Sequence, residues 1–319
     1  MRFAHAKLSG PALVRGGAGE GTMGTRCVVG AMALALTMVG AAGAQEIKGS
    51  VLEPSPANLA RTWDGANVVL PAALAGGALW QGRLRDMPAA AGRSPDAMAG
   101  RSPDATVVRS PDATVVRSPV VVVMHGSSGV AGFIKDYQVW LAVVLGLPSV
   151  APDSMAIPDR LTYTSPVGKD VYERVHDLRL AELRHALAQV ATLPWADPER
   201  VGIVGTSEGA VPVARLPEAG PAARIVYSWS CETNYFVEEP RTAIPRETPV
   251  LSVIASRDPY FSPDNPWNTA YAVKGHCAEA LKTHAGAAVL LLASDKHTVM
   301  NTPEARDAAR AFLARTLKP

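Results

Sequence analysis

The chain has 319 residues, of which 48% are hydrophobic and 19% are charged, so it contains enough apolar material for a core of ordinary globular size. Its formal net charge is only +2. This balance argues against nucleic acid or an anionic membrane surface as a partner, since both require a concentrated positive field.

Residues 23–44 follow the pattern of a secretory signal peptide. Arg26 supplies a short positive region, residues 27–42 form an almost uncharged apolar run, and the run ends in the A-x-A cleavage signature of residues 42–44. Because the run is short for a bilayer span, we expect cleavage and no stable membrane anchor in the mature protein. Residues 1–22 show no helical or strand period, and we interpret them as a mis-assigned upstream extension. The prediction is a periplasmic or secreted protein.

The mature chain, residues 45–319, is expected to form a single domain. Removal of 44 residues from 319 leaves 275, a size consistent with one large α/β domain. Two cysteines remain in it, Cys231 and Cys277. An oxidising compartment permits a disulfide between them, and two buried thiols are the alternative. Sequence spacing leaves both open, because it does not fix the distance between the two Cα atoms.

Strand and helix patterns alternate along the mature chain. The apolar run 120–124 is uninterrupted, which is typical of a strand buried on both faces of a parallel sheet. In chain order, we expect an extended lead-in at 46–61, an edge hairpin from strands 67–70 and 78–85, further strands at 120–124, 149–153, 201–204, 223–230, 249–255 and 287–293, and helices at 133–145, 170–193 and 303–317, the last capped by Thr302. This alternation predicts an α/β fold with a mostly parallel central sheet and helices on both faces. Such sheets carry their sites at the carboxyl ends of the strands.

A short tandem repeat interrupts this alternation. The octet Arg-Ser-Pro-Asp-Ala-Thr-Val-Val occurs at residues 101–108 and again at 109–116, with a degenerate copy before them and a partial copy after them. An eight-residue period is too short for architectures whose repeats stack on a shared core, and Ser-Pro-Asp favours turns. We interpret residues 93–117 as a repeat-expanded surface loop without a catalytic role.

The motif Gly-Thr-Ser-Glu-Gly, residues 205–209, follows the expected strand 201–204. A sharp turn from a strand into a helix strains the backbone of its central residue, and side chains two positions away on either side would collide. Glycine at 205 and 209 removes the collision, so the pattern predicts a turn that exposes the Ser207 hydroxyl as a nucleophile. An ordinary glycine-rich loop is the alternative.

A serine nucleophile needs a base that takes its proton and a third group that orients the base. Asp258 and His297 follow Ser207 in the chain, and each lies just past an expected strand, so we assign them as the acid and the base. Glu232, which follows the preceding strand, is the alternative acid. The other candidates are weaker by position: Asp264, Asp295, His125, His185, His276 and His284, of which His125 is expected to brace its loop.

Acyl transfer also needs hydrogen-bond donors for the negative oxygen that develops on the substrate. The backbone N–H of Glu208 is one candidate, because it begins the turn after the nucleophile. The backbone N–H of Ser127 is the other, in the glycine-containing loop that follows strand 120–124.

These motifs together resemble an α/β-hydrolase, in the style of the dienelactone hydrolase-like families. The resemblance rests on Val-Val-Val-Val-Met-His-Gly-Ser-Ser-Gly at 120–129, the motif at 205–209, Arg257-Asp258 and His297. It implies a serine hydrolase without metal or cofactor, with Ser207, Asp258 and His297 in the catalytic positions. Dienelactone hydrolases proper carry a cysteine nucleophile, so their substrate is not transferred to this chain. Glu208 is a second departure, for which pairing with an arginine and discrimination against anionic substrates are both open.

We therefore predict a serine hydrolase that cleaves a carboxylic ester or a related acyl bond of a small molecule through an acyl-enzyme. A peptidase or acyltransferase on the same scaffold is the alternative, and a non-catalytic binding protein is a third. Aromatic residues in the loops after two strands are expected either to shape the substrate pocket or to anchor the loops: Trp229, Tyr235, Phe236, Tyr260, Phe261 and Trp267. The segment 157–169 is expected to cover part of the site.

Overall fold

The computed structural model describes residues 46–87 and 117–317. The predicted signal peptide at 23–44, the upstream extension at 1–22 and nearly all of the repeat loop at 93–117 lie outside these residues and remain predictions. Within the described ranges, no helix combines the length and the apolar character needed to cross a membrane.

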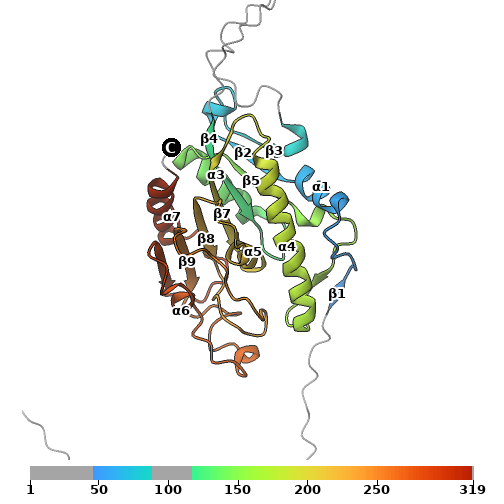
Figure 1. Cartoon of the computed structure of the whole chain (residues 1–319), viewed down its shortest axis with the longest axis vertical. Helices are drawn as coiled ribbons and strands as arrows, with labels where there is room; N and C mark the ends of the chain where they lie inside the picture. The colour runs from blue at the N-terminus through green and yellow to red at the C-terminus, as the bar shows by residue number, and fades with distance from the viewer. Residues whose placement is uncertain (1–45, 88–116, 318–319) are drawn as a thin grey trace, which may run out of the picture. The chain divides into compact units, whose positions relative to one another are not determined.

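Eight strands form one central sheet in the order β10-β9-β8-β7-β4-β5-β2-β3 (Figure 1). Their bounds are β2 Asn67–Leu70, β3 Trp80–Arg83, β4 Ser118–Met124, β5 Ser149–Ala151, β7 Ala196–Thr206, β8 Ala223–Tyr227, β9 Val250–Ala255 and β10 Ala287–Leu292. All neighbouring strands from β10 to β5 are parallel, whereas β2 is antiparallel to both β3 and β5. The predicted mostly parallel sheet with an antiparallel edge hairpin is confirmed.

The parallel registers bring the carboxyl ends of the strands to one edge of the sheet. Met124 of β4 lies beside Gly205 of β7, Thr206 lies beside Tyr227 of β8, and Leu292 of β10 lies beside Ala255 of β9. The loops after these strands, which hold the candidate site residues, therefore begin close together.

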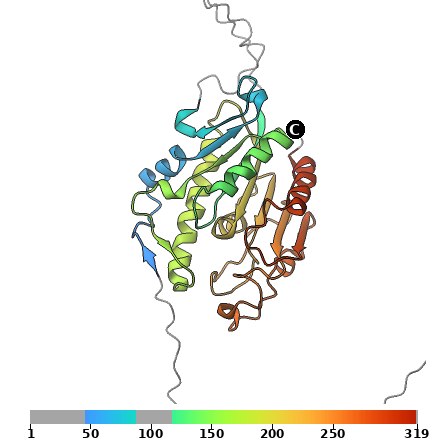
Figure 2. The ribbon, with the colours of Figure 1, turned by 180° about the vertical axis from the view of Figure 1, so that it is seen from behind.

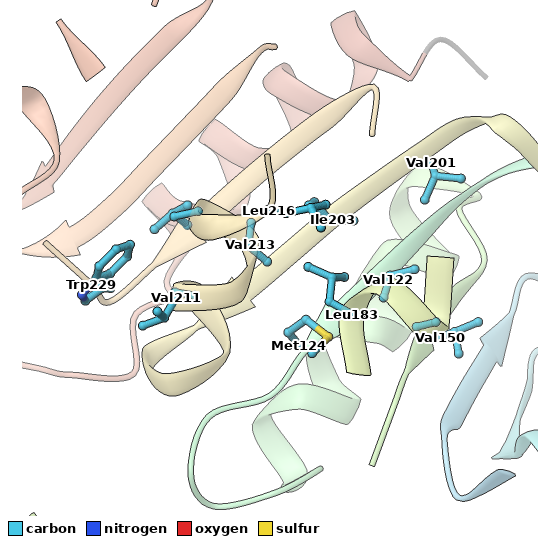
Figure 3. Close-up of a cluster of buried hydrophobic side chains, with 14 of the residues drawn as sticks. Val122, Met124, Val150, Leu183, Val201, Ile203, Val211, Val213, Leu216 and Trp229 are labelled. Carbon is cyan, nitrogen blue, oxygen red and sulfur yellow. The ribbon is translucent and has the colours of Figure 1, made fainter. Parts of the chain in front are cut away.

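Helices cover both faces of the sheet, as predicted. Their bounds are α1 Pro56–Asp64, α3 Gly132–Leu145, α4 Lys169–Val190, α5 Ala210–Arg215, α6 Ala278–Leu281 and α7 Pro303–Thr316. Successive side chains of β4 point to opposite faces. Val122 and Met124 pack with Leu183 of α4 in one apolar cluster (Figure 3). Val121 and Val123 belong to a second cluster with residues of α3 and α7, which lie on the other face (Figure 2).

The extended lead-in predicted for residues 46–61 is wrong in its second half. Helix α1 begins at Pro56, with Ser55 as its N-cap, and the Ser55 hydroxyl accepts the Asn58 N–H at 3.3 Å. Proline suits the first helical position, where an N–H would have no partner within the helix, so Pro56 starts this helix and does not prevent it. Helix α7 begins in the same way, with Pro303 at its first position and the predicted cap Thr302, whose hydroxyl accepts the Ala305 N–H at 3.3 Å.

Cys231 and Cys277 form a disulfide, with their Cα atoms 4.8 Å apart. Both residues are buried. The bridge joins the loop after β8 to the residue that precedes α6. The loop after β8 also contributes Tyr235 and Phe236 to the site described next.

Candidate active site

Ser207 lies in the sharp turn that the glycine motif predicts. Its φ of 54° is in the left-handed region, which costs a non-glycine residue about 1–3 kcal/mol. A Cβ atom on Gly205 would lie 2.1 Å from the carbonyl oxygen of Gly209, and one on Gly209 would lie 2.3 Å from that of Met124. Both glycines are therefore required for the strained turn to form, as the sequence spacing predicts.

His297 and Asp258 are hydrogen-bonded, with His297 Nδ1 2.8 Å from Asp258 Oδ2. The Asp258 side chain is fully buried, and its other oxygen accepts the backbone N–H groups of Tyr260 at 2.9 Å and Phe261 at 3.2 Å. The Ser228 hydroxyl donates to the backbone carbonyl of His297 and fixes the loop. These contacts orient the imidazole so that Nδ1 faces the carboxylate and Nε2 is left for another partner.

Ser207 and His297 line the same cavity, which has a volume of about 290 Å³. The loop after β4 forms one wall, where a Cβ atom on Gly126 would lie 3.4 Å from that of Ser207. Ser127, whose N–H is a candidate oxyanion donor, lines the cavity beside it. The structure thus gathers Ser207, His297 and, behind the imidazole, Asp258.

The alternative acids and bases lie elsewhere. Glu232 accepts the backbone N–H groups of Lys274 and Gly275 at 2.7 and 3.0 Å and lines a different hollow of the surface. His125 is fully buried, and its Nε2 accepts the Ser154 N–H at 3.0 Å, so it braces its loop as expected. Asp264, Asp295, His185, His276 and His284 do not line the cavity.

The aromatic loops divide between the two expected roles. Tyr235, Phe236, Tyr260, Phe261 and Trp267 line the cavity, together with Phe133 and Tyr163. Trp229 does not; it is fully buried in the core. The ring of Tyr260 lies 4.5 Å from that of His297, so this wall is in direct contact with the candidate base.

A model of the dienelactone hydrolase family matches residues 104–317. The chain belongs to the dienelactone hydrolase family. This membership makes the protein an ester hydrolase with the α/β-hydrolase fold, and the mostly parallel sheet covered by helices agrees with it.

Three similar solved structures are distant in sequence from this member of the family. A putative dienelactone hydrolase from Klebsiella pneumoniae is 16% identical, with 65% of this chain and 90% of that chain covered and a TM-score of 0.44. Esterase PE8 is 20% identical, with coverages of 64% and 95% and a TM-score of 0.42. An acetyl xylan esterase from Paenibacillus sp. R4 is 18% identical, with coverages of 63% and 75% and a TM-score of 0.44. No curated protein matches the chain.

Glu208, the residue after the candidate nucleophile of this hydrolase, forms a buried ion pair. Its Oε1 accepts from Arg160 Nη2 at 2.7 Å, and its Oε2 accepts from the Tyr163 hydroxyl at 2.7 Å. Both partners belong to the segment 157–169, and Tyr163 lines the cavity, so this segment covers part of the site as predicted. Of the two roles open for Glu208, pairing with an arginine is observed.

Arg179 and Glu182 of helix α4 extend this network. Arg179 Nη1 donates to Glu182 Oε2 at 2.6 Å, Nη2 donates to the carbonyl of His125 at 2.8 Å, and Nε lies 3.5 Å from Glu208 Oε1. Sequence reasoning missed these residues because charges on a helix usually face solvent. A signal was present, since residues 175, 179, 182, 183 and 186 share one face of the helix. The two charges thus fall among the apolar positions of that face.

Burial and the arginines determine the charge of this network. Burial opposes ionisation of Glu208, but the positive charges of Arg160 and Arg179 outweigh it and hold the Glu208 pKa below its ordinary value. Burial, reinforced by Arg179, holds the pKa of His125 well below its ordinary value, so its imidazole stays uncharged. Arg160 is paired with the carboxylate of Glu208, and Arg179 is paired with that of Glu182. Within the described residues, no group of three His, Cys, Asp or Glu side chains is arranged to hold a metal ion.

Proposed function

We propose that the enzyme is a serine hydrolase that cleaves carboxylic esters through an acyl-enzyme. The observation that carries this proposal is the position of His297, which is bonded to the buried carboxylate of Asp258 and lines the same cavity as Ser207. This arrangement supplies the nucleophile, the base and the orienting acid that acyl transfer to a hydroxyl requires.

The chemistry follows from these roles. Ser207 Oγ attacks the ester carbonyl while His297 Nε2 takes its proton, and the imidazolium then gives that proton to the departing alcohol. A water molecule, activated by the same nitrogen, attacks the acyl-enzyme and releases the acid. Asp258 keeps the imidazole in the tautomer that has its proton on Nδ1 and stabilises the cation that forms.

The oxyanion of each tetrahedral intermediate is assigned to the backbone N–H groups of Ser127 and Glu208. The close approach of Gly126 to Ser207 supports this assignment, because it brings the loop after β4 against the nucleophile. Loss of one such donor costs about 2.7–4 kcal/mol of transition-state stabilisation.

The test is the hydrolysis of p-nitrophenyl esters of increasing acyl length, run beside thioester and peptide substrates. We expect short esters to be the best substrates, because a cavity of about 290 Å³ is at the small end of ligand sites. Ser207→Ala is expected to abolish turnover without unfolding the protein. A folded Ser207→Ala variant that keeps the wild-type rate would contradict the proposal.

We also propose that the protein is exported and that its mature chain begins at Gln45, after cleavage of the signal peptide at residues 23–44. The disulfide between Cys231 and Cys277 supports this proposal, because disulfides persist in oxidising compartments. Mass spectrometry of the purified, natively expressed protein should give a mature N-terminus at Gln45, and an N-terminus far upstream of it would contradict export.

A further inference from the structure

We propose that the site selects uncharged esters over esters that carry a carboxylate, and that Glu208 is the residue that sets this selectivity. The inference rests on the proposed function, and it concerns the substrate class of the same site. Three observations support it: the chemistry of the cavity wall, the contacts of two buried arginines, and the position of Glu208 between them and the nucleophile.

The cavity wall offers no fixed charge to a substrate. Its lining consists of glycine, hydroxyl-bearing and aromatic residues and the candidate base: Gly126, Ser127, Ser128, Phe133, Tyr163, Thr164, Ser165, Thr206, Ser207, Tyr235, Phe236, Tyr260, Phe261, Trp267, His297 and Thr298. No Asp, Glu, Lys or Arg side chain is among these lining residues. A substrate carboxylate that enters this cavity would lose its water without gaining a cationic partner, which is strongly unfavourable.

Two arginines lie behind this wall, and both are already engaged. Arg160 donates through Nη2 to Glu208 at 2.7 Å, through Nε to Ser154 Oγ at 2.6 Å and through Nη1 to the Leu161 carbonyl at 2.8 Å. Only 2% of its side chain is exposed, and that of Arg179 is fully buried. Arginine is the side chain best suited to bind a carboxylate, but Arg160 and Arg179 are already bonded to the protein's own carboxylates.

Glu208 links these arginines to the reacting atoms. It follows Ser207 in the chain, and its carboxylate also accepts from Tyr163, which lines the cavity. Removal of this one negative charge would leave the buried network with one net positive charge directly behind the nucleophile. That charge would act on the oxyanion of both kinds of ester, but only an anionic substrate would also be attracted by it, so the ratio of the two rates reports the selectivity.

A pair of aryl acetates tests the inference: methyl 4-acetoxybenzoate, which is uncharged, and 4-acetoxybenzoate, which carries a carboxylate in place of the methyl ester. Cleavage of the acetyl ester is measured in both. We expect the wild-type enzyme to hydrolyse the uncharged ester with a kcat/KM at least about a hundredfold higher, the size of the penalty for an unpaired charge. In Glu208→Gln, this ratio should fall roughly tenfold, as expected for one uncompensated unit charge that acts through partly screened protein.

The double variant Glu208→Gln with Arg160→Met is the charge-matched control. It restores a balanced network, so the ratio should return toward the wild-type value even if both rates are lower. A loss of packing would instead leave the double variant as altered as the single one. Thermal unfolding monitors the fold, and if Glu208→Gln does not fold, Arg160→Met alone should raise the ratio.

The results that overturn the inference differ from those that overturn the proposed function. Wild-type kcat/KM values for the two esters within about threefold of each other, both dependent on Ser207, would refute the selectivity and leave the serine mechanism intact. A folded Glu208→Gln variant with an unchanged ratio would refute the role of Glu208. Hydrolysis of either ester that persists in Ser207→Ala, or the absence of any hydrolysis, would count against the proposed function itself.

Discussion

Asp258→Asn is expected to lower kcat by about four orders of magnitude while the protein stays folded. The reason lies in the contacts of the two carboxylate oxygens. Oδ1 accepts two backbone N–H groups, from Tyr260 and Phe261, and Oδ2 faces His297 Nδ1 at 2.8 Å. Asparagine has one oxygen and one NH₂ group, so only one of these two positions can keep an acceptor.

The backbone N–H groups of Tyr260 and Phe261 determine which of the two positions the amide oxygen takes. An NH₂ group turned toward them would leave two buried N–H groups without an acceptor, at a cost of about 1–3 kcal/mol each. The amide oxygen therefore takes the Oδ1 position, and the NH₂ group faces His297. Nδ1 must then accept a hydrogen bond, which moves the imidazole proton to Nε2, the atom that has to take the proton of Ser207. The loss of about four orders of magnitude corresponds to roughly 5.5 kcal/mol of transition-state stabilisation.

Steady-state hydrolysis of a short p-nitrophenyl ester measures this effect, with thermal unfolding as the check on the fold. Glu232→Gln is the matched control, because Glu232 also accepts two backbone N–H groups but lines a different hollow of the surface. It should change kcat by less than about threefold. A folded Asp258→Asn variant that keeps more than about a tenth of kcat, or a large loss in Glu232→Gln, would refute the reasoning.

Three further results are expected. Replacing both Cys231 and Cys277 by alanine should lower the free energy of unfolding by about 4 kcal/mol in denaturant titration, since the bridge closes a loop with a sequence separation of 46; a loss below about 1 kcal/mol would contradict this. His125 and His176 both have pKa values below the ordinary 6.5 because they are buried, so the unfolded chain binds more protons. The contribution of these two uncharged imidazoles to the free energy of unfolding is complete above about pH 6.5. At lower pH the free energy of unfolding falls by up to about 2.7 kcal/mol per pH unit, and His125→Gln should halve that slope. Trp267→Ala should raise KM for aryl esters about tenfold with little change in kcat, and an equal change for acetate esters of small alkyl alcohols would exclude ring contact as the cause.

The sequence predicts that the candidate site residues lie close together, because the topology of the sheet determines where the strand ends meet. Residues that follow parallel strands necessarily meet at one edge of a sheet, so the strand ends before Ser207, Asp258 and His297 were sufficient to place them together. The two motif glycines added the local turn. Their Cβ atoms would collide with neighbouring backbone, and this requirement is visible in the spacing alone.

The features that could not be predicted depend on distances that spacing does not fix. The spacing of Cys231 and Cys277 leaves the disulfide open because their sequence separation of 46 does not fix the distance between them. Helix α1 was missed because Pro56 fits an extended chain and a helix start equally well. The network around Glu208 was missed for a different reason. Arginine is ordinarily a surface residue, and although Arg179 falls among the apolar positions of its helix face, only the three-dimensional structure shows that it and Arg160 are paired with buried carboxylates.

Covalent labelling of the folded protein with a fluorophosphonate, followed by peptide mapping, tests the central claim most directly. The reagent reacts only with a hydroxyl that is activated as a nucleophile. The account predicts one adduct on Ser207 in the wild-type protein and a labelling rate reduced by orders of magnitude in His297→Ala. Folded, ester-hydrolysing protein that carries no adduct on Ser207 would contradict it.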